Sequence, residues 1–387
     1  MKPSSIMIIA GEISGDMHAA ALLRAMRRQR PDLVCFGIGG ENLRAAGMET
    51  HYDVRDMAVL GLTEVLLRFR FFKRVFDEML ALARQRRPDA ILLVDYPGFN
   101  LRFAARAHAL GFKVLYYICP QVWAWNRGRI PRMARVVDRL LAIFPFEADV
   151  FKNSGLRVDF VGHPLVAQAA AARAEPLAPL PWPGEPRIAL LPGSRYHEVK
   201  RILPVMWAAA ALVQRQFPGA GFIIAAPSEE VAGWARTVMG SLGKGPEHVS
   251  VVAGQTRQVL RQARAALVAS GTATIETALM RCPMLVVYRV AWATYCIGRL
   301  LIRVPYLGMV NIVAGERLCP EFIQHEARPE AMAAALSPLL RAGPARETML
   351  AGLDRVSQAL GDPQAAEHAA DIILREIMNS LQEVRRQ

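Results

Sequence analysis

The stretch that decides the fold is residues 6–16, IMIIAGEISGD, where a short apolar run passes directly into a loop with two glycines. The apolar run predicts a strand buried on both faces, and the pattern from about Asp16 to Gln29 predicts a helix after it. The same order of strand, turn and helix recurs outward along the chain. Further strands are expected at 33–38, 90–95, 113–118, 139–144 and 158–161. Apolar strands that alternate with helices favour an α/β fold with a parallel sheet.

The pattern stops after Pro164 and restarts at Arg187. Residues 165–186 have no clear period and contain five prolines, which predicts a hinge. Beyond it, strands are expected at 187–191, 221–226, 249–253, 265–269 and 284–288. We therefore predict two doubly wound, Rossmann-like domains at 1–164 and 187–360. A helical tail at 361–387 is expected to pack back on the first domain or on a partner chain, and the strand ends are expected to face a cleft between the domains.

Length and composition exclude several classes of protein. The 387 residues are 53% hydrophobic and 21% charged, which excludes a disordered chain. No uncharged apolar run approaches about 18 residues, so no membrane span is expected, and residues 6–10 are too short an apolar run for a signal peptide. The five cysteines form no C-x-x-C pair, so we expect neither a zinc cluster nor a disulfide framework, and a reduced, cytoplasmic setting.

The charge predicts an anionic partner. Lys and Arg number 47 against 34 Asp and Glu, a formal net charge of +13. Nucleic acid, a phosphorylated substrate and an acidic membrane surface all fit this excess. The basic residues are dispersed, with net +8 through Pro164 and +5 after it, and no RRM, KH or zinc signature is present. Nucleic acid is therefore the least favoured of the three.

Candidate catalytic groups follow two strands of the first domain. The first loop contains Glu12, Ser14 and Asp16, and either Ser14 or Asp16 could cap the next helix. Asp95 ends another buried strand, where poor solvation should raise its pKa toward that of a useful base. A helix-capping Asp is the alternative interpretation of Asp95.

An aromatic loop follows the next strand of this domain. Trp123 and Trp125 lie in a segment rich in aromatic and amide side chains, as carbohydrate sites often are. The same pair could instead pack on a neighbouring loop.

Two loops of the second domain resemble anion sites. The first contains Gly193, Ser194 and Arg195, and the second contains Ser270, Gly271 and Thr272. Free N–H groups at a helix start, together with hydroxyls and a guanidinium, are suited to phosphate. Glu276 lies four residues after Thr272 and could accept the hydroxyls of a ribose, or could be an ordinary surface residue.

A segment from residue 66 to 76 interleaves apolar and basic side chains. Such helices bind membrane surfaces, although a helix with a buried Phe face or a base-stacking surface would have the same pattern. The expected membrane-contacting residues are Phe69, Arg70, Phe71, Phe72, Lys73, Arg74 and Phe76.

Together these motifs resemble the lipid-A-disaccharide synthase family, which are inverting glycosyltransferases with the GT-B fold. The resemblance runs nearly end to end. It rests on residues 11–16 (GEISGD), 59–66 (VLGLTEVL), 94–100 (VDYPGFN), 120–125 (PQVWAW), 145–147 (PFE), 160–164 (FVGHP), 191–195 (LPGSR) and 269–273 (ASGTA). Some members have an acid three residues after Asp95, where this chain has Gly98. That leaves Asp95 as the single carboxylate of this loop.

The resemblance implies transfer of a sugar from UDP-2,3-diacylglucosamine to 2,3-diacylglucosamine 1-phosphate, with release of UDP. It implies that Asp95 is the base, with Glu12, Asp16 or His18 as alternatives, and that Arg195 is a UDP ligand. Asn311 is also counted among the expected substrate-binding residues. The expected location is the cytoplasmic face of the inner membrane, with a homodimer as one option.

No D-x-D pair occurs among the aspartates, so neither a metal nor a cofactor is expected. The alternative function is that of a UDP-GlcNAc 2-epimerase-like enzyme acting on a soluble nucleotide sugar. The aromatic and basic segment argues against it, because a soluble substrate needs no such surface.

Overall fold

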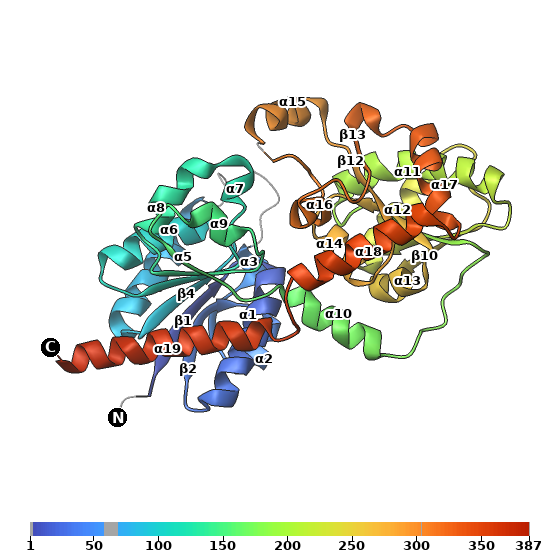
Figure 1. The fold of residues 1–387 in the computed structure, drawn as a ribbon. Coiled ribbons are helices and arrows are strands. Elements are labelled where there is room, and N and C mark those ends of the chain that lie inside the picture. Colours follow the sequence, from blue (N-terminus) through green and yellow to red (C-terminus); the bar gives the residue numbers. More distant parts are fainter. Residues whose placement is uncertain (1–2, 58–68, 303, 387) are drawn as a thin grey trace. The chain divides into compact units, whose positions relative to one another are not determined.

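The computed structural model describes residues 3–57, 69–302 and 304–386 (Figure 1). The chain divides into two compact units, of which the first comprises residues 1–164 and 364–387 and the second residues 165–363. In the described residues, each unit contains one parallel sheet, with seven strands in the first and six in the second. The two sheets with their intervening helices confirm the α/β class.

The sheet of the first unit has the order β3-β2-β1-β4-β5-β6-β7. Its inner strands are buried along their whole length, which explains their continuous apolar sequences. The strands are β1 (Ser5–Ala10), β2 (Val34–Gly39), β3 (Glu49–Asp53), β4 (Ala90–Val94), β5 (Val114–Tyr117), β6 (Arg139–Ala142) and β7 (Arg157–Phe160).

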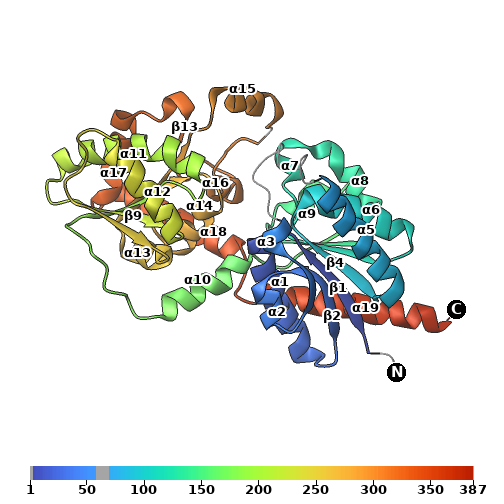
Figure 2. The same ribbon diagram turned by 180° about the vertical axis from the view of Figure 1, so that it is seen from behind.

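The helices of the first unit connect and cover these strands (Figures 1 and 2). The longer ones are α1 (Ile13–Gln29), α5 (Phe69–Arg86), α6 (Pro97–Ala109) and α19 (Ala365–Arg386). The shorter ones are α2 (Glu41–Ala45), α3 (Val54–Met57), α7 (Val122–Trp125), η1 (Arg127–Arg129), α8 (Ile130–Ala134) and α9 (Glu147–Phe151).

The sheet of the second unit has the order β10-β9-β8-β11-β12-β13. Its strands are β8 (Arg187–Leu191), β9 (Gly221–Ala226), β10 (Val249–Ala253), β11 (Ala265–Ala269), β12 (Met284–Tyr288) and β13 (Glu321–Ile323). Its helices are α10 (Pro164–Ala174), α11 (Tyr196–Gln216), α12 (Glu229–Gly240), α13 (Thr256–Gln262), α14 (Thr272–Leu279), α15 (Trp292–Leu301), α16 (Met309–Ala314), η2 (Gln324–Glu326), α17 (Pro329–Leu340) and α18 (Pro344–Ala359).

The segment expected to be a hinge is more ordered than its prolines suggest. Its first part forms α10, and its remainder is fastened to the second unit. The Arg261 guanidinium donates to the carbonyls of Ala172 and Glu175 at 2.7 and 3.0 Å. The Ser250 hydroxyl donates to the carbonyl of Pro181 at 2.9 Å. Residues 165–186 therefore belong structurally to the second unit.

The C-terminal helix α19 packs against α1 in the first unit. Ala369, Ile373 and Ile377 are buried and recur every four residues, so they form one apolar stripe. Glu376, also buried, pairs with Lys113 at 3.0 Å and with Arg139 at 2.6 Å. The last segment of the chain is thus tied to strand ends far from it in sequence.

Within the described ranges, no helix is both long enough and apolar enough to cross a membrane.

Candidate functional site

The candidate residues of each unit gather where the strand order of its sheet reverses. In the first sheet this point lies between β1 and β4, and in the second between β8 and β11. Doubly wound sheets bind ligands beyond the carboxyl ends of the strands at such points. The loops after β1 and β4 contain Glu12 and Asp95, and those after β8 and β11 contain the two predicted anion sites.

Asp95 and Glu12 follow strands that lie side by side, with Ala10 opposite Val94. Asp95 is half-buried and Glu12 is exposed. Burial, and then the nearby charge of Glu12, raise the pKa of Asp95 to about 6, against the opposing effect of a backbone hydrogen bond from Tyr96. The raised pKa expected from the sequence is confirmed.

The turn that holds Asp95 is strained. Asp95 and Tyr96 have φ values of 47° and 48°, in the left-handed region that residues other than glycine rarely occupy. The Asn100 side chain donates to the Asp95 carbonyl at 2.8 Å, and the hydroxyl of the fully buried Tyr116 donates to the same oxygen. Backbone strain of this kind is found where a functional side chain must be presented in a fixed direction.

Gly11 allows this turn to pack closely against the first loop. A Cβ atom at Gly11 would lie 2.2 Å from Cδ1 of Tyr96, so no larger residue fits without displacing the ring. The Tyr96 hydroxyl in turn donates to the carbonyl of Met57 at 3.1 Å. The close packing of the Tyr96 ring against the first loop therefore requires a glycine at position 11.

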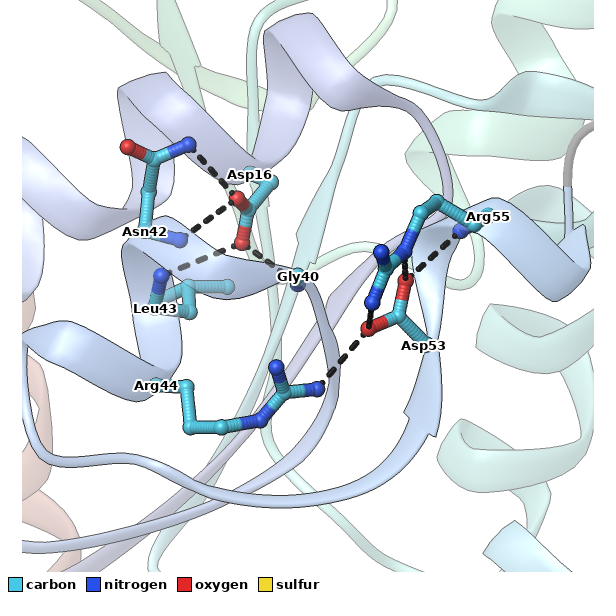
Figure 3. A network of polar contacts seen from close by, with 7 residues as sticks. All are labelled: Asp16, Gly40, Asn42, Leu43, Arg44, Asp53 and Arg55. Atoms are coloured by element: carbon cyan, nitrogen blue, oxygen red, sulfur yellow. Dashed lines mark hydrogen bonds and ion pairs between the residues drawn. The ribbon is translucent and has the colours of Figure 1, made fainter.

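Asp16, expected as a catalytic candidate, has a structural role in this arrangement (Figure 3). Its side chain is 2% exposed and accepts hydrogen bonds from the amides of Gly40, Asn42 and Leu43 at 2.6, 3.1 and 3.1 Å. The Asn42 side chain donates a fourth, at 2.9 Å. Asp16 therefore fixes the start of α2, and its oxygens are engaged in holding that loop.

A second carboxylate in Figure 3, that of Asp53, is also engaged by the protein. Hydrogen bonds from Arg55, and then from Arg44 at 2.8 Å, hold the pKa of Asp53 well below its usual range.

Neither predicted cap of α1 is observed. Ser14 lies exposed in the first turn, and the residue before the helix is Glu12, which forms no side-chain cap. His18 lies one turn further along α1. Burial lowers its pKa to about 4, so its side chain is neutral near pH 7. Glu12 is thus the exposed carboxylate of this loop, whereas that of Asp16 is buried and hydrogen-bonded.

The aromatic loop presents one of its two tryptophans. Trp123 is 3% exposed and its indole N–H donates to Oε1 of Glu147 at 3.1 Å. Glu147 is fully buried, and burial raises its pKa to about 7. Trp125 is 46% exposed, with the Arg129 guanidinium 5.1 Å above its ring. Trp123 therefore anchors the loop, and Trp125 is the member of the pair able to meet a ligand.

The backbone amides of the loop after β8 already donate hydrogen bonds to a side chain of the helix that follows it. Glu198, on the first turn of α11, accepts from the amides of Ser194 and Arg195 at 3.0 and 3.3 Å and from the Arg195 guanidinium at 3.0 Å. The amides expected to be free are therefore capped. The Arg195 side chain is 77% exposed, so its guanidinium remains accessible. Gly193, with a φ of 117°, leaves the space that Glu198 fills.

The loop after β11 is more open. The Ser270 hydroxyl donates to the carbonyl of Leu307 at 2.8 Å, so it supports the loop. Thr272 is exposed, and within the described chain no side chain caps α14, which begins there. Glu276 pairs with Arg257 at 2.7 Å, which fixes its position. The α14 amides and Thr272 are the accessible donors of this loop.

Asn311 is fully buried and engaged on both sides of its amide. It donates to the Cys319 carbonyl at 2.8 Å and to Glu321 at 2.9 Å, and it accepts from the Cys319 amide at 2.8 Å. Asn311 therefore supports the turn before β13 and does not reach the surface.

The helix α5 turns most of its aromatic rings inward. Phe76 stacks edge-on against Phe99 and Phe103, with ring centroids 5.5 and 5.4 Å apart, and Phe71 and Phe72 are half-buried. Phe69 is 57% exposed. The neighbouring basic residues Arg70, Lys73 and Arg74 are also exposed. Residues 66–68, and the whole of the motif at 59–66, lie outside the described residues.

Several functional neighbours were not predicted from the sequence. Glu198 could have been found from its position three residues after Arg195, a common spacing for a carboxylate that caps a helix start. Asn100, Glu147 and Arg257 act through partners distant in sequence, and nothing in their own segments signals this.

Two parallel sheets with loops gathered at both switch points define a GT-B protein. Solved structures agree: a putative UDP-N-acetylglucosamine 2-epimerase from Listeria monocytogenes has a TM-score of 0.65 at 15% identity and covers 98% of this chain and 97% of its own. MurG from Acinetobacter baumannii has a TM-score of 0.56 at 15% identity and covers 96% of this chain and 100% of its own.

The sequence narrows this class further. The model of the lipid-A-disaccharide synthetase family matches residues 6–382. Lipid-A-disaccharide synthase from Myxococcus xanthus is 41% identical over 96% of this chain and 97% of its own length, and that from Syntrophus aciditrophicus is 40% identical over 98% and 100%. The chain belongs to the lipid-A-disaccharide synthase family of glycosyltransferases, which confirms the resemblance seen in its motifs.

Proposed function

We propose that this protein transfers the sugar of UDP-2,3-diacylglucosamine to the 6-hydroxyl of 2,3-diacylglucosamine 1-phosphate with inversion, and releases UDP. The observation that carries the proposal is the strained turn at the first switch point, which presents Asp95 beside Glu12. Family membership supports the reaction class, and the expected membrane location follows from substrates that carry acyl chains.

Asp95 acts as the general base. The acceptor hydroxyl oxygen attacks the anomeric carbon while the bond from that carbon to the UDP oxygen breaks, and the hydroxyl proton passes to the Asp95 carboxylate. A pKa of about 6 leaves Asp95 mostly ionised near pH 7, yet makes it a stronger base than an ordinary Asp. Inversion follows because the reaction is a single displacement.

The second unit binds UDP through the loops after β8 and β11. Negative charge develops on the β-phosphate as the bond breaks, and the Arg195 guanidinium and the amides at the start of α14 are suited to receive it. These donors supply positive charge without a metal ion. Glu198 would have to share or yield Arg195 when the anion arrives.

The accessible residues of the predicted set divide among the parts of the substrates. Trp125 offers a ring for a sugar face, and Glu276, held by Arg257, offers oxygens for a ribose. Ser270, Asn311, Trp123 and Asp16 are held by hydrogen bonds within their own units and have supporting roles. The homodimer stays a prediction.

The test is UDP release with both acylated sugars, compared with UDP-GlcNAc alone. Release that requires the acylated pair would support the proposal. Release or epimerisation with UDP-GlcNAc alone would favour the 2-epimerase alternative and contradict it.

Membrane contact through α5 is also proposed, and the structure sharpens its test to one aromatic side chain. Because Phe69 is exposed while Phe76 packs in the core, Phe69→Ser should reduce sedimentation with anionic vesicles several-fold without unfolding the protein. Unchanged sedimentation would contradict a role for this segment. Phe160→Ser, which removes another exposed Phe of the same unit, is the matched control.

A further inference from the structure

The helix α15 of the second unit exposes apolar side chains to an unusual extent. None of its ten residues is buried. Trp292 is 65% exposed, Ile297 58%, Leu300 81% and Leu301 50%. Large apolar side chains gathered on one exposed element mark an interaction surface.

One narrow side of α15 faces the protein. Tyr295, Gly298 and Ile302, spaced three and four residues apart, are half-buried and line a cavity of about 240 Å³. The border residues Thr294 and Arg299 also line it, and its other walls include Tyr288, Tyr306 and Glu321. This side accounts for the attachment of the helix to its unit, and Figures 1 and 2 show α15 at the margin of that unit, away from its sheet.

The opposite side is apolar across about half of the helix circumference, at about 100° per residue. The outward residues are Trp292, Ala293, Cys296, Ile297, Leu300 and Leu301, all exposed. The polar residues Thr294 and Arg299 lie at the two borders of this arc. The usual pattern of a surface helix, polar outward and apolar inward, is therefore reversed.

The surroundings of α15 are basic. No Asp or Glu occurs from residue 277 to 315, a range that contains Arg281, Arg289, Arg299 and Arg303. Within the described chain, Arg281 pairs with Asp354, whereas Arg289 and Arg299 form no ion pair. The apolar arc is thus bordered by Arg299, which has no ion-pair partner among the described residues. Glu321, the acidic residue that lines the cavity on the protein side, accepts from the amides of Leu307 and Gly308.

We propose that α15 lies in the plane of an anionic phospholipid bilayer, with its outward arc among the acyl chains and Arg299 at the headgroups. Trp and Leu on one face with Arg at its border is the pattern of helices that bind membrane interfaces. A second copy of the chain would bring an equally basic surface against this one, which disfavours self-association. This contact belongs to the second unit and depends neither on α5 nor on the identity of the substrate.

Cys296 provides a direct probe, because it lies in the outward arc and is the exposed cysteine of the five. Burial raises the pKa of the Cys35, Cys282 and Cys319 thiols to about 12, and that of Cys119 well above its usual value, so these four react slowly. A polarity-sensitive fluorophore on Cys296 should shift to the blue with vesicles containing phosphatidylglycerol, and much less with phosphatidylcholine alone. Cys296→Ser should abolish the labelling.

Substitution tests the same contact without a label. Ile297→Ser combined with Leu300→Ser should lower the vesicle partition coefficient about tenfold or more, and Arg299→Gln should weaken binding to anionic vesicles several-fold. Leu177→Ser is the matched control, since Leu177 is 59% exposed in the same unit but lies outside any helix.

Three outcomes would overturn the proposal. They are a label that stays in water while the protein sediments with vesicles, a blue shift that depends on protein concentration without vesicles, and unchanged partition of the double variant. Turnover of detergent-dispersed substrates is measured separately. Its retention in a variant that no longer binds vesicles separates failure of membrane contact from failure of the proposed reaction.

Discussion

The loops at the two switch points are positioned by opposite means. In the first unit, two residues in the left-handed region are locked by Asn100, Tyr116 and the close approach of Gly11, so the loop that contains Asp95 is rigid before any ligand binds. In the second unit, the loop that contains Arg195 is closed by the exposed contacts of Glu198, which a phosphate could replace. The difference indicates a preformed proton acceptor in one unit and an exchangeable anion site in the other.

Asp95→Asn should have the largest effect. Asn tolerates the left-handed conformation, so the turn should persist while the proton acceptor is lost. We expect turnover to fall about a thousandfold with UDP binding unchanged, measured by UDP release and by calorimetry with UDP. Near-normal turnover would move the base to Glu12. Asp32→Asn, at an exposed Arg pair of the same unit, is the control.

Arg195→Ala should follow, with a loss of about a hundredfold in kcat/KM, because the guanidinium meets the charge of the leaving group. Its matched control is Arg236→Ala, which removes another exposed Arg paired with a Glu in the second unit. Equal effects of the two substitutions would contradict a specific role for Arg195.

The pH dependence of kcat/KM should test the role of Asp95 in the rigid loop of the first unit. If Asp95 must be ionised, kcat/KM should rise with pH through about 6 and then level off. Because the negative charge of Glu12 raises this pKa, Glu12→Gln should move the rising limb to lower pH, which a pH profile of kcat/KM would show. An unmoved limb would indicate that another group controls it. His18 and His163, with pKa values lowered by burial to about 4 and about 3, cannot supply a limb near 6.

The smallest effect is expected from Glu198→Ala. Removal of the side chain that accepts from the Ser194 and Arg195 amides should release them and raise the affinity for UDP a few-fold, as measured by calorimetry. Weaker UDP binding would show instead that Glu198 holds the loop in its binding conformation. The start of α11 should be somewhat less stable in either case.

The sequence predicted the inner strands and the loops that lie at the two switch points, because continuous apolar runs followed by glycines are local signals. It missed β3 and β13, which lie at sheet edges and have few apolar residues to signal them. It also could not separate Asp95 from Asp16, or Trp125 from Trp123. The difference depends on Asn42 and Glu147, partners that only the folded chain brings near.

The return of α19 to α1 makes the first unit discontinuous, with the whole second unit inserted between its two pieces. During synthesis, residues 165–363 can therefore complete their fold before the unit that began first. Until the last helix leaves the ribosome, the apolar face of α1 stays uncovered, and Lys113 and Arg139 lack the carboxylate of Glu376. In a chain that ends before α19, the first unit, which is synthesised first, would thus stay incompletely folded. Such a chain would be an early target for chaperones and proteases.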